Sequence, residues 1–220
     1  MANATRARPH VVINAHLLSG RAWYRSAGIH QYIHYLLRHL AQVGDAVRYT
    51  VLLGEGQLAP DVSLETIRSR WPTRRAPVRI LWEQVIQPSV LRQVQANLVH
   101  GPHLALPLYA PCPAVVTIHD LSFMRFPNLF PAPNRLYLMA MARIAARRAR
   151  RIIAVSAYTA DEIARLLNVE RERIDVIYHG VNPIFRPLPP EEVAEFRRRR
   201  GLPERLILCV GTLEPRKNHT

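Results

Sequence analysis

The sequence is poor in cysteine, lysine and aromatic residues, and it contains no long apolar run. Cys112 and Cys209 are the only cysteines among 220 residues; they lie far apart and lack metal-ligand spacing. We therefore expect two ordinary thiols in a reducing compartment, not a disulfide framework or a zinc site. No apolar stretch approaches the roughly 20 residues that a membrane-spanning helix needs. The basic amino terminus lacks a small-residue cleavage site, so no signal peptide is expected.

Charge of one sign dominates the chain. Lysine and arginine total 30 against 16 acidic residues, which gives a formal net charge of +14, and Lys217 is the only lysine. Such an excess fits either an anionic partner or a tolerant surface, with the arginine content as a compositional habit. Nucleic acid, acidic lipid and phosphate-bearing substrates are all possible anionic partners. Aromatic residues make up only 7% of the chain, and no nucleic-acid-binding motif is visible. We therefore expect no nucleic-acid partner.

Short β-branched runs alternate with longer helical patterns along the first 181 residues. Strands are expected at His10–Asn14, Val47–Leu53, Val78–Leu81, Asn97–His100, Ala114–Ile118, Ile152–Val155 and Asp175–Tyr178. Helices are expected at Gly28–Gln42, Pro88–Gln95, Asn134–Arg150 and, capped by Ser156, up to Leu167, with Phe126–Pro133 as a loop. This alternation predicts an α/β fold: a Rossmann-like, doubly wound, mostly parallel sheet with helices on both faces. Ligands bind such sheets outside the carboxyl ends of the strands.

The composition changes after Val181. Residues 182–190 hold four prolines, which indicates a stiff linker. A short helix, Glu191–Arg200, is expected next, with Pro190 in its first turn and Gly201 ending it. Leu206–Val210 reads as one more buried strand. We thus expect a first domain at 1–181, a linker with a short helix at 182–205, and the first part of a second domain at 206–220.

Five segments in order carry a family likeness. They are Gly28-Ile29 with Tyr32-Ile33, Leu81–Gln84, Val116–Leu121, Ile153–Ser156 and Val210–Asn218. On these segments the chain resembles the retaining glycosyltransferases of family 4, especially the bacterial mannosyltransferase-like members, over nearly its whole length. The resemblance implies the two-domain GT-B fold, with this chain supplying the amino-terminal, acceptor-side domain and the first strand of the donor-binding domain.

The resemblance also implies an activity. It is the transfer of a sugar, with mannose a candidate, from a nucleoside-diphosphate sugar to a glycan or lipid-linked acceptor in cell-surface polysaccharide synthesis. No metal and no other cofactor are expected. The location is expected to be cytoplasmic, with peripheral contact to anionic membrane at its inner face. The family's paired-glutamate motif would lie beyond Thr220, so the chain alone is expected to be inactive. The alternative is a non-catalytic basic module that binds anionic membrane or nucleic acid.

Three residues of the first domain are candidate site residues. Gly28 opens the first long helix, where a glycine admits close ligand approach and the helix amino terminus offers N–H donors; an ordinary loop glycine is the alternative. His119 and Asp120 directly follow a buried strand. By resemblance His119 would contact the donor sugar, although a structural histidine under a loop is also compatible. Asp120 is expected to orient the loop or the histidine.

Two further candidates lie near the end of the chain. Arg216 and Lys217 match a basic pair of the family whose lysine contacts the donor diphosphate. The chemistry needs a cation there, because negative charge builds on the leaving diphosphate as the glycosidic bond breaks.

Other polar residues have a structural interpretation first. His100 and His103 are expected to be structural, bordering the acceptor site at most, because no carboxylate or cysteine stands at a metal-ligand spacing from them. Glu83 is expected to start a helix and to serve packing, with a catalytic carboxylate as the alternative. The arginines of Asn134–Arg150 and Arg197–Arg200 are either solvated faces or a surface attracted to anionic lipid.

Overall fold

The computed structural model describes residues 8–18, 27–44 and 46–211 of the chain. The chain divides into two units, Met1–Tyr178 and His179–Thr220. Within the described residues, no helix is long and apolar enough to cross a membrane.

The first unit is built on a parallel sheet of seven strands in the order β3-β2-β1-β4-β5-β6-β7. Every pair of neighbours is parallel. The strands are β1 (His10–Asn14), β2 (Arg48–Leu53), β3 (Glu65–Arg68), β4 (Leu98–Gly101), β5 (Ala114–Ile118), β6 (Arg151–Ala154) and β7 (Ile174–Val176). The chain moves outward from β1 to β3 and then returns to place β4 on the other side of β1. The strand order therefore reverses between β1 and β4, and ligands of doubly wound sheets bind at such a point.

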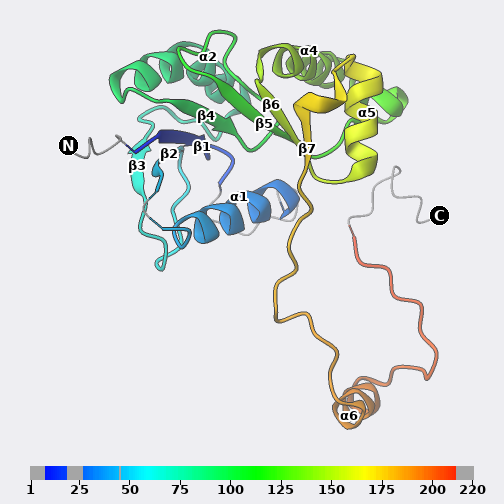
Figure 1. Ribbon diagram of the computed structural model, residues 1–220. Helices are drawn as coiled ribbons and strands as arrows, with labels where there is room; N and C mark the ends of the chain where they lie inside the picture. Colours follow the sequence, from blue (N-terminus) through cyan, green and yellow to red (C-terminus); the bar gives the residue numbers. More distant parts are fainter. Residues whose placement is uncertain (1–7, 19–26, 45, 212–220) are drawn as a thin grey trace. The chain divides into compact units, whose positions relative to one another are not determined.

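Helices cover both faces of this sheet, so the predicted α/β Rossmann-like fold is confirmed. Helix α1 (Ala27–Leu40) lies on one face, and α2 (Ala76–Gln93) and α4 (Ala132–Arg148) lie on the other (Figure 1). Helix α5 (Ala157–Leu167) follows β6, and the short α3 (Ser122–Arg125) follows β5. Single 3₁₀ turns, η2 (Pro127–Leu129) and η3 (Arg171–Arg173), precede α4 and β7.

Alternation along the strands produces two apolar cores, one on each face. Ile13 of β1 and Val51 of β2 pack with Ile33 and Leu37 of α1. The neighbouring residue Val12 belongs to the larger core, which contains the buried faces of α2, α4 and α5. Successive strand residues point to opposite faces, so one run of apolar residues supplies both layers.

The predicted strand Val78–Leu81 is wrong, because these residues lie inside α2. Pro77 stands at the start of that helix, where its fixed φ suits the first turn. Glu83, Gln87 and Leu91 follow at the four-residue spacing of its buried face. Glu83 therefore does not start a helix, as had been expected, but lies in the middle of one. Four apolar-rich residues were too short a window to separate a strand from a helix.

Two further elements differ from the sequence expectation. The edge strand β3 was not predicted, because its sequence Glu-Thr-Ile-Arg lacks an apolar face and its residues are largely exposed. The expected loop Phe126–Pro133 contains η2 and the start of α4, with Pro127 and Pro133 in their first turns. Proline is excluded from helix interiors but is well suited to these first positions.

The second unit contains α6 (Pro190–Arg200). Glu191 and Glu192 lie in its first turn, four arginines lie in its last turn, and Gly201 ends it at φ +61°, in agreement with the expected helix. The predicted strand Leu206–Val210 is not formed: these residues are exposed and outside any strand. A strand needs a neighbour for its backbone hydrogen bonds, and the described part of this unit contains no strand that could pair with Leu206–Val210.

Candidate functional site

The candidate site lies along the carboxyl ends of β1, β4 and β5. Three short segments leave the sheet there: Asn14–His16 from the last residue of β1, Gly101–His103 from the last residue of β4, and His119-Asp120 directly after β5. Parallel strands bring these segments to one edge, although up to 106 positions separate them in the sequence. The edge includes the point between β1 and β4 at which the strand order reverses.

His119 is held at this edge by contacts from two neighbouring elements. Its Nε2–H donates a hydrogen bond to the carbonyl oxygen of Pro102, at 3.0 Å. Its ring meets the ring of Tyr32 edge-on, with centroids 4.8 Å apart. Tyr32 lies one helical turn after Gly28, so the first turns of α1 lie against the end of β5. The half-buried His119 therefore has a fixed ring orientation at the edge of the sheet.

A buried network of polar side chains lies next to His119. Thr117 of β5 shares its hydroxyl between Tyr32 Oη, at 3.1 Å, and Nε2 of His100, at 2.9 Å. Burial, with smaller effects of the nearby His103 and His119, lowers the pKa of His100 from 6.5 to about 4. His100 is therefore neutral at neutral pH. Burial also raises the pKa of Tyr32, so this network carries no charge.

The other two predicted residues of this edge differ in their surroundings. Asp120 is exposed, and its Oδ1 accepts hydrogen bonds from the backbone N–H and the hydroxyl of Ser122, at 3.0 and 2.6 Å. These bonds shape the turn into α3. Gly28 is the second residue of α1 and is exposed, with no heavy atom within 4 Å of the position a Cβ would take. Its described neighbours would thus tolerate a side chain. Arg216 and Lys217 lie outside the described residues.

A second cluster at the same edge was not anticipated from the sequence. Glu83 of α2 is only 1% exposed, and its Oε1 accepts a hydrogen bond from Asn14 Nδ2 at 3.1 Å. The same oxygen lies 3.4 Å from Nε2 of His103 and 3.9 Å from Nε of Arg79. The ring of His16 packs on Trp82, with centroids 4.1 Å apart. Residues that follow β1 and β4 thus meet a carboxylate supplied by α2.

This cluster contains an ionised carboxylate beside a neutral imidazole. Burial raises the pKa of Glu83, but His103, Arg79 and Asn14 together outweigh burial and hold it below its usual range. Burial lowers the pKa of His16 from 6.5 to about 4, against a smaller opposing effect of Glu83. The sequence signal for the cluster was weak: Glu83 and Gln87 are polar residues at helical spacing on an otherwise apolar face.

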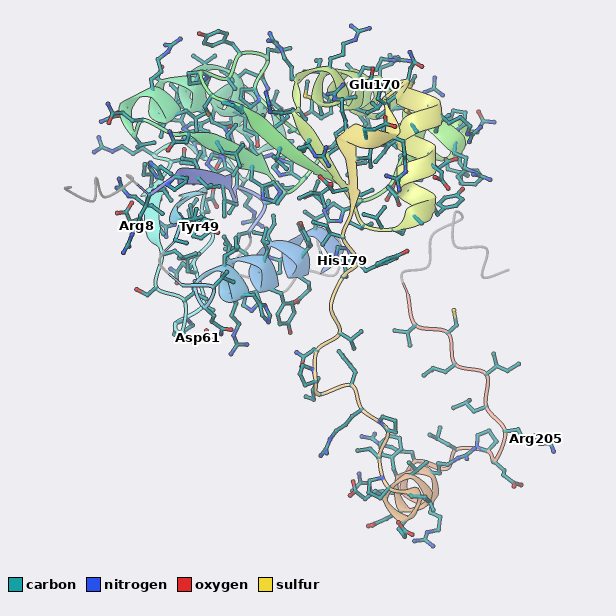
Figure 2. All side chains as sticks on the ribbon, in the orientation of Figure 1. Arg8, Tyr49, Asp61, Glu170, His179 and Arg205 are labelled. Carbon is teal, nitrogen blue, oxygen red and sulfur yellow. The ribbon has the colours of Figure 1, made fainter. Side chains whose placement is uncertain are left out.

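Two other features of the described residues bear on the choice of site. No group of three or more histidine, cysteine or acidic side chains is arranged to hold a metal ion in the described part of the chain. A hollow of about 570 Å³ at the amino-terminal end of the sheet is lined by residues that include Arg8 and Tyr49. Figure 2 labels these two residues. Arg48 and Glu65 in the wall of the hollow form an ion pair, at 2.8 Å, so the charges of these two side chains compensate each other. That end of the sheet is also opposite the edge at which such folds bind ligands.

The parallel sheet, whose strand order reverses between β1 and β4, defines a Rossmann-like domain of the kind found in GT-B enzymes, and sequence comparison identifies the family. The model of Glycosyltransferase Family 4 matches residues 26–185, and the chain belongs to this family. The chain is 29% identical over 150 residues to O-antigen chain mannosyltransferase B of Escherichia coli, a match that covers 66% of this chain and 39% of that protein. It is 30% identical over 132 residues to 2-deoxystreptamine N-acetyl-D-glucosaminyltransferase of Streptomyces fradiae, covering 60% and 31% of the two chains.

Solved structures of glycosyltransferases share the fold. HepE of Anabaena in complex with UDP superimposes with a TM-score of 0.55 at 17% identity, over 88% of this chain and 50% of that one. WaaG, a glycosyltransferase involved in lipopolysaccharide biosynthesis, superimposes with a TM-score of 0.56 at 16% identity, over 88% and 52%. Both neighbours have the GT-B fold, as the sequence resemblance implied. The chain spans about half the length of these structures and less of its curated relatives.

Proposed function

We propose that this chain is the acceptor-side part of an enzyme that transfers a sugar from a nucleoside-diphosphate sugar to a glycan or lipid-linked acceptor in cell-surface polysaccharide synthesis. The observation that carries the proposal is the fixed His119 ring at the carboxyl edge of β5, in a chain of Glycosyltransferase Family 4. Mannose is the candidate sugar, since an O-antigen mannosyltransferase is among the relatives. A UDP complex of HepE supports a nucleotide-sugar donor.

The proposed chemistry separates positioning from charge stabilisation. His119, held by Pro102 and Tyr32, orients the transferred sugar by hydrogen bonding to its hydroxyl groups. As the bond between the sugar and the diphosphate breaks, negative charge grows on the leaving oxygens, and Arg216 and Lys217 stabilise it. The transfer retains the anomeric configuration, with the departing diphosphate helping to deprotonate the incoming hydroxyl. No metal and no further cofactor take part in this scheme.

The proposed location is the cytoplasmic face of a membrane. The arginines on the exposed side of α4 are Arg143, Arg147 and Arg148, and α6 ends in Arg197–Arg200. Each cation near an anionic bilayer contributes about 1 kcal/mol, so several together give peripheral binding. Such contact would bring the enzyme to a lipid-linked acceptor. Binding of anionic membrane without any sugar transfer is the rival function.

Release of nucleoside diphosphate from several sugar nucleotides, mannose donors among them, tests the proposal. The assay compares the 220-residue chain with an enzyme extended through a second domain, with and without lipid-linked acceptor. We expect turnover only from the extended enzyme, because donor and acceptor must be held together in one closed site. His119→Ala should lower its kcat/KM about a hundredfold, whereas His39→Ala, on the exposed end of α1, should leave it unchanged. Vesicle binding by an extended enzyme that releases no nucleotide would favour the rival.

A further inference from the structure

Glu83 of α2 is connected to His119 through the turn after β4. The carbonyl oxygen of Pro102 accepts the hydrogen bond from His119 Nε2–H at 3.0 Å, and the ring of the next residue, His103, lies 3.4 Å from Glu83 Oε1. A carbonyl oxygen only accepts, so this bond places the proton of the neutral His119 ring on Nε2. The position of one backbone carbonyl therefore decides both the orientation and the tautomer of His119.

The Glu83 carboxylate is a fixed point for this turn. It is only 1% exposed, and its Oε1 also accepts a hydrogen bond from Nδ2 of Asn14, the last residue of β1, at 3.1 Å. Burial raises the pKa of Glu83, but His103, Arg79 and Asn14 outweigh burial and keep the carboxylate ionised. Contacts to an ionised group are roughly twice as strong as contacts between neutral groups. Glu83 therefore ties the end of β1 and the turn after β4 to one helix.

The next residue of α2 holds the far end of the same loop. Gln84 donates from Nε2 to the carbonyl oxygen of Leu106 at 3.2 Å, and its Oε1 accepts from the backbone N–H of Leu108 at 2.7 Å. Two adjacent side chains, Glu83 and Gln84, thus contact the loop 101–108 near its start and at its end. The carbonyl that orients His119 lies between these contacts, so α2 determines where it stands.

A second support of His119 comes from α1 and does not involve α2. The ring of Tyr32 meets the His119 ring edge-on, with centroids 4.8 Å apart, and Tyr32 Oη lies 3.1 Å from the hydroxyl of Thr117. This contact would remain if the turn after β4 shifted. A change at Glu83 should therefore alter the tautomer and the orientation of His119 without releasing the ring from the edge of the sheet.

We propose that Glu83 is a positioning residue for His119: through His103 and the turn after β4, it holds the carbonyl oxygen that orients the His119 ring. Gln84 assists by holding the far end of the loop. The orientation of His119 does not depend on any activity, whereas its use in sugar transfer rests on the proposed function. Because Glu83 is almost completely buried, it acts only through its neighbours.

Imidazole-ring NMR of the 220-residue chain tests this positioning directly. With ¹⁵N in the histidine rings, long-range ¹H–¹⁵N spectra distinguish a neutral ring that carries its proton on Nε2 from one that carries it on Nδ1. The parent chain should show His119 mainly as the Nε2–H tautomer. Glu83→Gln keeps the side-chain volume but removes the charge. It should raise the Nδ1–H fraction of His119 about fivefold, the effect of weakening one neutral hydrogen bond.

Two further variants distinguish positioning from general destabilisation. His10 is a buried residue at the start of β1, and its Nδ1–H donates to the carbonyl oxygen of Val94 at 2.9 Å, at the opposite end of the sheet. His10→Gln should lower the stability in urea but leave the His119 tautomer unchanged. Gln84→Ala frees the far end of the loop and leaves the carboxylate in place. It should raise the Nδ1–H fraction at least twofold, and it replaces Glu83→Gln should that variant fail to fold.

Three NMR results would overturn the proposal. The first is a parent chain in which neutral His119 carries its proton mainly on Nδ1. The second is an unchanged His119 ring in folded Glu83→Gln, or in Gln84→Ala where Glu83→Gln does not fold. The third is a change in His10→Gln as large as that in the loop variants, because the ring would then respond to lost stability alone.

A double-mutant cycle in the enzyme extended through a second domain connects this positioning to catalysis. Glu83→Gln should lower kcat about tenfold with little change in the acceptor KM, because a misplaced group mainly weakens the transition state. In a His119→Ala background the same substitution should lower kcat less than twofold, since residues that act through one another are not additive. Equal losses in the two backgrounds would overturn the positioning role.

The two kinds of measurement separate this proposal from the proposed function. An altered His119 tautomer in the loop variants, without nucleotide release by the extended parent enzyme, would retain the positioning and reject the transferase. Nucleotide release by the extended parent enzyme, with an unaltered His119 tautomer in the loop variants, would retain the transferase and reject the positioning.

Discussion

Acidification should destabilise the first unit because it contains two histidines that are buried in the neutral form. Burial lowers the pKa of His16 and of His100 from 6.5 to about 4 in the folded protein. In the unfolded chain both rings titrate near 6.5. The unfolded state therefore binds more protons below pH 6.5, and the free energy of unfolding falls as the pH falls from about 6.5 toward about 4.

The size of this effect follows from the range of pH over which the two rings are protonated in the unfolded chain but neutral in the folded protein. At pH 5 that interval is about 1.5 pH units, which corresponds to about 2 kcal/mol for each ring at 1.36 kcal/mol per unit. Two rings give a loss of about 4 kcal/mol, a large share of the roughly 5–15 kcal/mol that stabilises a typical domain. Glu65 and Asp175, whose arginine partners lower their pKa, contribute mainly below this window.

Urea unfolding of the chain between about pH 7 and pH 5 measures the predicted slope. His100→Gln places an amide near Nε2, where it keeps a hydrogen bond to Thr117 but removes the titrating group. This variant should lose about half of the pH dependence, and the exposed His39→Gln should lose none of it. A free energy of unfolding that stays constant over this range would refute the reasoning. An equal slope in His100→Gln and the parent chain would exclude His100 as a source.

Three further predictions concern the amino-terminal cap of helix α5, binding to anionic membranes and stabilisation of the leaving diphosphate. Ser156→Ala should cost about 1 kcal/mol in urea unfolding, because the Ser156 hydroxyl accepts from the Thr159 N–H at 3.1 Å at the start of α5; the exposed Ser63→Ala should be neutral. Cosedimentation with anionic vesicles should be strong at low salt and weak at high salt, since exposed charges are screened over about 10 Å at 0.1 M; absence of binding at low salt would remove the membrane contact. In the extended enzyme, Lys217→Ala should lower kcat about a hundredfold with little change in acceptor KM; kinetics like those of the parent would make Lys217 an ordinary surface residue.

The sequence predicted those elements whose local signals agree with their surroundings. The bounds of β5 were predicted correctly, because five apolar or β-branched residues end abruptly at His119-Asp120. The start of α5 was also correct, since Ser156 is a strong helix cap. The residues of helix α2 were predicted as a strand and a separate short helix. Pro88 was placed at the start of that short helix, but in the structure it lies inside α2. Edge strand β3 has no apolar face and depends on pairing with β2, which no local window contains.

The candidate site was predictable to a similarly limited degree. His119 stood out because it directly follows a buried strand, a position that the topology turns into a ligand-binding edge. The Glu83 cluster did not stand out, because its members come from three distant parts of the chain: Asn14 and Glu83 are 69 positions apart. A buried polar group is recognisable only once its partners, or their absence, are known. Burial and missing hydrogen bonds are properties of the folded chain, and sequence spacing does not contain them.

The turn after β4 contacts both polar clusters at the carboxyl edge of the sheet. Pro102 accepts the hydrogen bond that orients His119, and the next residue, His103, faces Glu83. Gly101, which begins the turn, has no room for a side chain: a Cβ there would lie 2.8 Å from the carbonyl oxygen of Ala105 and 3.0 Å from Leu106 Cδ2. The turn is thus closed against its own loop, and a displacement of His103 also moves the carbonyl that holds His119. The turn therefore fixes the position of His119 relative to His103 and Glu83.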